Sequence, residues 1–207
     1  MAGTHFTDDA PAQQHRVLLA DGTGASVRRL GPADLDVVER LHLELPRDDY
    51  YRRFFGFCTG AASEVARTML GSDSVAVGLF RSGVLDGVAN FRGPEPPEIA
   101  FAVAHSAQHF GIATLLLEAL VSEARVRGVR RLVAEVLTVN AAMLEVFADS
   151  KLPIAREMDG GVVHLSIDIP REGPSPYLDA LLERHGRAGA GVLARGDGGI
   201  GGGEKHR

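Results

Sequence analysis

The sequence has few of the residues that build covalent or metal-based sites. Cys58 is its only cysteine, which excludes an internal disulfide and a metal cluster built from cysteines. Because Cys58 follows the aromatic residues Phe54, Phe55 and Phe57, we interpret it as a small packed hydrophobic residue rather than a nucleophile. No histidine pair at helical i, i+4 spacing has an acid nearby, so the sequence gives no metal-binding pattern and we expect no metal.

Excess positive charge and long apolar runs are also missing. A net charge of -5 and a pI near 5.9 provide no broad positive field, so we do not expect nucleic acid as a partner. No stretch approaches the roughly 20 apolar residues of a membrane-spanning helix, and residues 1–16 lack the apolar middle of a secretory signal. We therefore expect a cytoplasmic protein with no membrane partner.

The amino-terminal half has the patterns of two hairpins and two helices. With 207 residues, 45% of them hydrophobic, the chain can bury one substantial core. Strand-like runs at 17–19 and 25–29 surround an Asp-Gly turn, and runs at 75–80 and 84–91 surround a second turn. Helical periodicity covers 32–45 and 63–70. His42 lies on the apolar stripe of the first helix and is interpreted as a packed core histidine.

Two further segments have a biased composition. Residues 48–58 are aromatic and basic, which suits a second helix or the wall of a pocket. After residue 170, a short helix is expected at 177–184. Residues 186–203 are so rich in glycine that ordering them would cost more entropy than their few apolar side chains could offset. We expect a flexible segment at 1–15, one folded domain at 16–170, and a short helix with a disordered tail at 171–207.

The centre of the chain alternates strands with helices. In residues 98–104 the side chains of Ile99, Phe101 and Val103 point one way and mostly small side chains point the other. Residues 114–127 form the clearest helix, whose polar face carries Thr114, Glu118, Ser122 and Arg125. Gly128 ends this helix. A strand at 131–137, a helix at 141–150 capped by Asn140, and a strand at 161–169 complete the pattern.

A Q-x-x-G-x-A spacing joins the strand at 98–104 to the long helix. A helix start exposes unpaired backbone N–H groups and the positive end of the helix dipole, so it can hold a pyrophosphate without a basic side chain. Gly111 and Ala113 leave room for phosphate oxygens to approach the backbone. The common nucleotide loops G-x-x-x-x-G-K-[ST] and G-x-G-x-x-G are absent.

These features together resemble the GNAT acetyltransferase family. The resemblance rests on the 98–103 strand, the loop from Gln108 to Ala113, the 133–137 strand and the segment from Asn140 to Leu144. It implies the GNAT acyl-CoA N-acyltransferase fold, an α/β (α+β) fold whose mostly antiparallel sheet is splayed at the cofactor site and flanked by helices. The hairpin at residues 21–22, the 51–55 run and the 160–164 strand are more narrowly similar to the catalytic domain of bacterial protein lysine acetyltransferases.

The resemblance implies a cofactor, an acceptor and a set of binding residues. The cofactor is acetyl-CoA as co-substrate, and the acceptor is a primary amine, foremost a protein lysine. The sequence leaves the oligomeric state open, a homodimer included. The implied cofactor-binding residues are Phe101, Ala102 and Val103 for the pantetheine arm, Gln108, His109, Phe110, Gly111, Ile112, Ala113 and Thr114 for the pyrophosphate, and Asn140 and Phe147 beside the arm or thioester.

Acyl transfer to an amine requires a base, because an ammonium has no lone pair with which to attack. Glu98 begins the strand expected beside the thioester, and the resemblance places the general-base glutamate of the family there. Glu135 in the next strand is the competing acid, and it could equally be the structural partner of an arginine. Asn140 could cap its helix, contact the cofactor, or do both.

The chain departs from the family pattern at several positions. His109 and Phe110 stand where the family has glycine and arginine, and Lys151 with Leu152 replaces a Gly-Phe pair. Phe147 stands where many members carry a tyrosine that protonates the leaving thiolate, and a phenyl ring cannot do so. Two hypotheses therefore remain. One is a working N-acetyltransferase, and the other is a non-catalytic module of the same fold that binds a ligand or a partner protein.

Overall fold

The computed structural model describes residues 14–46 and 61–171. The predicted aromatic and basic run at 48–58, with Cys58, lies outside the described residues, as do the helix at 177–184 and the glycine-rich tail. The elements in chain order are β1 (His15–Leu18), β2 (Gly24–Arg29), η1 (Pro32–Asp34), α1 (Leu35–Glu44), α3 (Ala62–Met69), β3 (Ser74–Arg81), β4 (Val84–Arg92), β5 (Glu98–Val103), η2 (His105–Ala107), α4 (Ile112–Val126), β6 (Arg131–Leu137), α5 (Ala141–Asp149), β7 (Ile154–Asp159) and β8 (Val162–Asp168).

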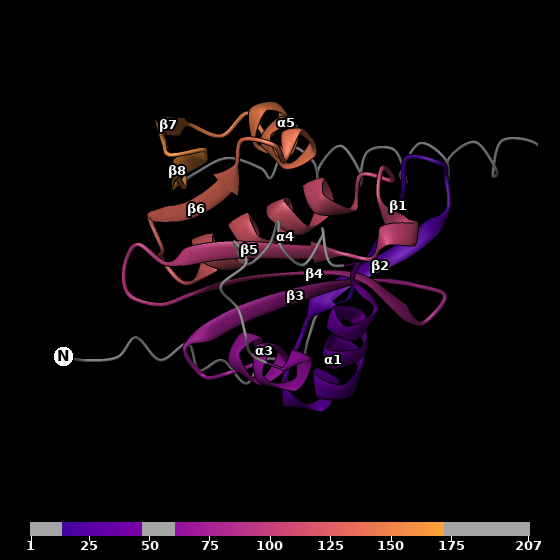
Figure 1. Cartoon of the computed structure of the whole chain (residues 1–207). Coiled ribbons are helices and arrows are strands. Elements are labelled where there is room, and N and C mark those ends of the chain that lie inside the picture. The colour runs from indigo at the N-terminus through magenta and orange to yellow at the C-terminus, as the bar shows by residue number, and fades with distance from the viewer. Residues whose placement is uncertain (1–13, 47–60, 172–207) are drawn as a thin grey trace, which may run out of the picture. The chain divides into compact units, whose positions relative to one another are not determined.

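The described strands form one eight-stranded sheet in the order β1-β2-β3-β4-β5-β6-β8-β7. Every neighbouring pair is antiparallel except β5 and β6, which are parallel. Helices α1 and α3 lie against one face of the sheet and α4 lies against the other (Figure 1). This is the mostly antiparallel, helix-flanked sheet that the sequence predicts. No helix within the described ranges is both long and apolar enough to cross a membrane.

Each face of β3 and β4 is buried by a different helix layer. On the α1 and α3 side, Val38, Ala66 and Val88 belong to one buried cluster. On the other side α4 packs very closely, since a Cβ added at Gly87 would lie 2.8 Å from the Ile112 side chain. Burial on both faces explains why β3 and β4 read as continuous apolar runs rather than alternating ones.

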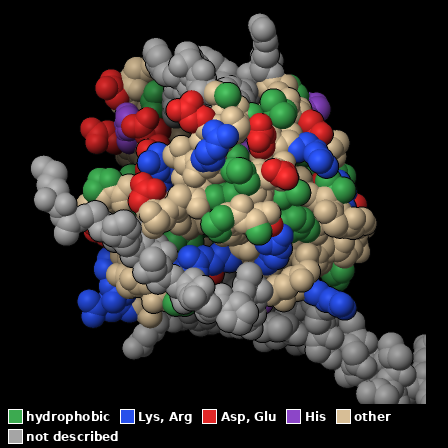
Figure 2. Space-filling view, turned by 90° about the horizontal axis from the view of Figure 1, so that it is seen from below, with side chains coloured by type: hydrophobic (Ala, Val, Ile, Leu, Met, Phe, Trp, Pro, Cys, Tyr) green, Lys and Arg blue, Asp and Glu red, His purple; other side chains and the backbone are tan. Residues whose placement is uncertain are grey.

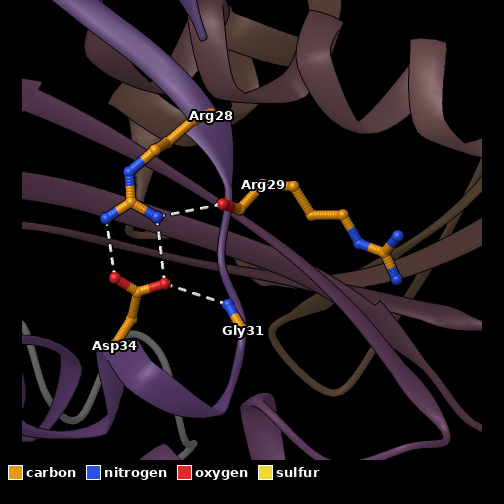
Figure 3. Close-up of polar contacts among 4 residues, drawn as sticks. All are labelled: Arg28, Arg29, Gly31 and Asp34. Carbon is orange, nitrogen blue, oxygen red and sulfur yellow. Dashed lines mark hydrogen bonds and ion pairs between the residues drawn. The ribbon is translucent and has the colours of Figure 1, made fainter. Parts of the chain in front are cut away.

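Arg28 ties β2 to the start of the first helix (Figure 3). Its guanidinium donates to both carboxylate oxygens of Asp34, at 2.9 and 2.6 Å, and to the carbonyl of Arg29 at 3.1 Å. Asp34 also accepts from the backbone N–H of Gly31 at 3.0 Å. The hydrogen bonds from Arg28 hold the pKa of Asp34 below its usual range, and the N–H of Gly31 adds to the effect. This fork fixes the direction in which the chain leaves the sheet.

The sequence located most elements correctly. Both hairpins form, with left-handed glycines at the turns, Gly22 at φ 83° and Gly83 at φ 83°. His42 is buried as predicted, and its Nδ1 lies 2.8 Å from the carbonyl oxygen of Val38. Strand β7 was missed. All of its residues except Ile154 are exposed, so its sequence has no apolar alternation to detect.

Candidate active site

The sheet separates between β5 and β6. The two strands share a single register pair, Glu98 with Val133, supported by a 3.0 Å hydrogen bond from the Val133 N–H to the Pro97 carbonyl. Beyond this pair the strands diverge, as Figure 1 shows. The backbone groups of β5 that face the gap make no ladder with β6, so a ligand inserted there can pair with them. The predicted splay of the sheet is present.

A cavity of about 540 Å³ lies at this gap. It is bounded by β5, the loop before α4, β6 and α5. The residues predicted from the sequence to bind cofactor or to catalyse line it with one exception, Phe110. Those on the wall are Glu98, Phe101, Ala102, Val103, Gln108, His109, Gly111, Ile112, Ala113, Thr114, Asn140 and Phe147.

The loop that enters α4 has the backbone geometry of an anion site. Gly111 is the N-cap of α4 with a left-handed conformation, φ 79° and ψ 11°, and the space where a Cβ would lie is open. No side chain among the described residues caps this helix start. The first N–H groups of α4 therefore meet the cavity beside Ile112, Ala113 and Thr114, where the helix dipole favours negative charge.

His109 and Phe110, the two bulky residues of the loop, take different directions. His109 has φ 69°, a left-handed value that is uncommon for a residue with a Cβ, and it lines the cavity. Phe110 lies outside the lining. The guanidinium carbon of Arg81 lies 5.4 Å from the Phe110 ring centroid, and the Phe110 carbonyl accepts from the N–H of Ala20 at 3.2 Å. The phenyl ring therefore does not fill the mouth of the helix.

Asn140 and Phe147 form the α5 wall of the cavity. The side-chain oxygen of Asn140 accepts from the backbone N–H of Met143 at 3.3 Å, so Asn140 caps α5 and lines the cavity at once. Phe147 is buried, and its ring packs edge-on against Phe101 with centroids 6.1 Å apart. This contact joins α5 to β5 across the gap that separates β5 from β6.

The two acids predicted as alternative bases lie on neighbouring strands. Glu98 is exposed at the start of β5, and it lines both the main cavity and an adjoining cavity of about 380 Å³. Glu135 lines both cavities too. The ion pair that the structure shows for Glu135 is with a histidine, since its carboxylate lies 3.3 Å from Nδ1 of His164. The cross-strand register of β6 and β8 produces this pair.

Three ionisable residues of the smaller cavity, Arg156, Glu157 and His164, were not singled out from the sequence. Glu157 faces His164 across the β7–β8 register, so the imidazole lies in one row between the carboxylates of Glu135 and Glu157. Detecting this row required the pairing order of β6, β8 and β7, which no local pattern provides. Figure 2 shows acidic side chains gathered around a histidine near the left edge of the face that it draws.

One residue of α4 departs from its predicted setting. Glu118 was expected on the exposed polar face, but it is half-buried, and its Oε2 has no hydrogen-bond partner among the described residues. Burial raises the pKa of Glu118 to about 8. Glu118 lies one turn beyond Thr114 but does not line the cavity, so we assign it no part in the site.

Comparison with known proteins agrees with this geometry. Residues 39–149 match the model of the acetyltransferase (GNAT) family. The chain is 36% identical over 87 residues to acetyltransferase Pat of Mycolicibacterium smegmatis, which is 42% of this chain but only 26% of that protein. The GNAT domain of S. lividans PAT superposes with a TM-score of 0.67 at 28% identity, over 75% of this chain and 96% of that domain.

More distant structures share the fold. YncA of Salmonella typhimurium, solved with acetyl-CoA, has a TM-score of 0.52 at 18% identity, over 72% of this chain and 95% of that protein. At this identity the likeness concerns the fold alone. The family match covers more than half of the chain and agrees with the split sheet and the open helix start. The chain belongs to the GNAT acetyltransferase family.

Proposed function

We propose that this chain transfers an acetyl group from acetyl-CoA to a primary amine, with a protein lysine as the acceptor and Glu98 as the general base. The observation that carries the proposal is the cavity at the β5–β6 gap, which joins an uncapped helix start to a carboxylate at the foot of β5. A pyrophosphate fits the helix start and a pantetheine arm can pair with the free edge of β5. The choice of a protein lysine as acceptor follows the resemblance of the sequence to bacterial protein lysine acetyltransferases.

The proposed chemistry needs only side chains that line the two cavities. The acetyl thioester of the co-substrate supplies the group that is transferred. Glu98 accepts a proton from the acceptor ammonium, directly or through water, and frees the nitrogen lone pair. A C–N bond then forms at the thioester carbonyl while the C–S bond breaks. The nitrogen loses its second proton as the amide forms, and a proton reaches the departing thiolate through water, because Phe147 has none to give.

The acceptor is proposed to enter through the smaller cavity. Glu98, Ala134 and Glu135 line both cavities, so the two spaces meet beside the proposed base. Glu98, Glu135 and Glu157 outnumber Arg156 among the charged residues of the smaller cavity, and this excess of negative charge attracts an ammonium. This explains how cofactor and acceptor could approach the same carboxylate from different sides.

Two measurements test the proposal. Calorimetric titration with acetyl-CoA should show binding, and acetylation of a lysine peptide should follow. Glu98→Gln should lower kcat by about 10²- to 10⁴-fold while leaving the Kd for acetyl-CoA nearly unchanged. Glu64→Gln, at an exposed glutamate in the first turn of α3, is the matched control and should change neither quantity. Unchanged turnover in Glu98→Gln would eliminate Glu98 as the base.

One observation favours the alternative of a non-catalytic binding module. The exposed imidazole of His109 lines the mouth of the helix, and its backbone occupies a conformation that glycine adopts more easily. If the loop had lost its cofactor, acetyl-CoA would fail to bind even at millimolar concentration. That single titration separates the two functions.

A further inference from the structure

Phe110 is the one predicted cofactor contact whose side chain does not reach the cavity, and its surroundings explain why. Its half-buried ring faces Arg81, the last residue of β3, at 5.4 Å from guanidinium carbon to ring centroid. The Nε of the same guanidinium lies 2.6 Å from a carboxylate oxygen of Asp86 in β4. We call Arg81, Asp86 and Phe110 the Arg81 clamp.

Backbone hydrogen bonds attach both ends of the loop to the same region. At its start, the N–H of Ala104 donates to the carbonyl of Asp86 at 2.8 Å. At its end, the N–H of Ala20, beside the β1–β2 turn, donates to the carbonyl of Phe110 at 3.2 Å. At the second of these anchors, the ring of Phe110 contacts Arg81. The backbone hydrogen bonds therefore hold the ends of the loop, and the contact with Arg81 concerns the direction of the Phe110 side chain.

The burial of Asp86 determines where the Arg81 guanidinium lies. The side chain of Asp86 is only 7% exposed, so its charge requires a close partner, and Arg81 supplies it. A guanidinium remains charged at all accessible pH values and attracts the face of an aromatic ring. With Arg81 fixed by Asp86, the ring of Phe110 has a preferred place outside the cavity. Among the contacts of the described residues, Arg81 is the charged group that lies over this ring.

We propose that Arg81 is a positioning residue for the cofactor loop, which keeps Phe110 away from the mouth of α4 and leaves Gly111 open to the pyrophosphate. This inference rests on the proposed use of acetyl-CoA. It concerns the pyrophosphate end of the cavity only, because the pantetheine arm is expected to pair with β5, which the clamp does not touch. The inference therefore predicts an effect that depends on which part of the cofactor is present.

The test compares two acetyl donors, acetyl-CoA and acetyl-pantetheine, which lacks the pyrophosphate. Arg81→Gln should raise the KM for acetyl-CoA about tenfold with little change in kcat, and should leave the kinetics with acetyl-pantetheine unchanged. Arg81→Lys should recover part of the loss, since it keeps the charge but not the planar group. Arg131→Gln is the control, because Arg131 pairs with Asp168 at 2.8 Å and lines neither cavity.

A double-mutant cycle tests whether Arg81 acts through Phe110. Phe110→Leu should raise the KM for acetyl-CoA, and adding Arg81→Gln to it should raise the KM little further. Arg81→Gln combined with Asp86→Asn avoids a buried unpaired charge, and it keeps the test valid if the single variant folds poorly.

Three results would overturn the inference: an unchanged KM in Arg81→Gln, an equal loss with both donors, or additive effects of Arg81→Gln and Phe110→Leu. These differ from failure of the proposed function itself, in which the unaltered protein would bind no acetyl-CoA at all.

Discussion

The strands on the two sides of the β5–β6 gap differ in how they are covered. On one side, β3 and β4 are buried along nearly their whole length between α4 and the layer of α1 and α3. On the other side, β6 alternates between buried and accessible residues and β7 is almost entirely exposed. The covered part supports β5 and α4, which line the proposed cofactor site. The open part supplies charged side chains facing solvent, where an acceptor can reach them.

The junction between these parts is as informative as the parts themselves. One register pair, Glu98 with Val133, connects β5 to β6, and the proposed base belongs to that pair. A closed sheet here would have satisfied more backbone groups but would have left no gap for a ligand. The site lies where the hydrogen-bonded pairing of β5 with β6 ends.

The largest expected effect tests the difference in covering directly. Leu79 in β3 is fully buried, whereas Met158 in β7 is 72% exposed. Leu79→Ala should lower the free energy of unfolding by about 2–5 kcal/mol, because it removes packed methyl groups and leaves a cavity. Met158→Ala, a truncation of similar size, should change it by about 0.5 kcal/mol or less. Urea denaturation of both variants measures the contrast, and similar losses would refute it.

A smaller effect concerns the cost of burying a charge in the covered part. The pKa of Glu118 is raised by burial from 4.5 to about 8, so the folded chain holds this proton more tightly than the unfolded chain does. Stability should therefore fall as pH rises from 4.5 to about 8. Because the side chain is partly exposed, solvent screening should limit the change to about 1–2 kcal/mol.

Glu118→Gln should remove this pH dependence and stabilise the protein at the alkaline end. The measurement is the urea midpoint at about pH 5 and about pH 9. Glu44→Gln, at an exposed position at the end of α1, is the control and should leave the dependence as it is. A Glu118→Gln variant that loses stability with pH as steeply as the unaltered protein would contradict the assignment.

The smallest expected effect compares two residues that adopt left-handed backbone conformations on opposite sides of the gap. His109 has φ 69° in the cofactor loop, and Lys151 has φ 56° before β7. Both stand where the family pattern has glycine. Replacing either residue with glycine should relieve strain and raise the free energy of unfolding by about 1 kcal/mol at most.

The two glycine variants should differ in cofactor binding. His109→Gly also removes a side chain from the mouth of α4, so it should lower the Kd for acetyl-CoA several-fold. Lys151→Gly, remote from the loop, should leave the Kd unchanged. Calorimetry on both variants decides the matter, and equal shifts in Kd would show that the imidazole does not limit access.

The local patterns of the sequence were sufficient to locate the helices beside the proposed cofactor site. Apolar periodicity predicted α4 from residue 114, two residues after its observed start at Ile112, and Asn140 marked the start of α5. These signals work because helix caps and left-handed glycines depend on residues only a few positions apart. The loop spacing likewise indicated that residues 109–111 need backbone conformations that glycine adopts more easily.

Other features depend on residues far apart in the chain, and only the tertiary structure decided them. Strand β7 is held by pairing with β8 rather than by burial, so no periodic pattern predicts it. The row of Glu135, His164 and Glu157 exists because β8 lies between β6 and β7. The burial of Glu118 is equally nonlocal.

The sequence by itself determined that a helix with an open, glycine-bearing start would follow a strand, because both elements are set by short-range periodicity and backbone conformation. It could not determine that Phe110 would turn toward Arg81, about thirty residues earlier in the chain, instead of into the cavity. Tertiary packing decided the direction of the Phe110 side chain, because the face of the ring is attracted to the guanidinium of Arg81. Whether the loop is usable thus depends on contacts that no local pattern records.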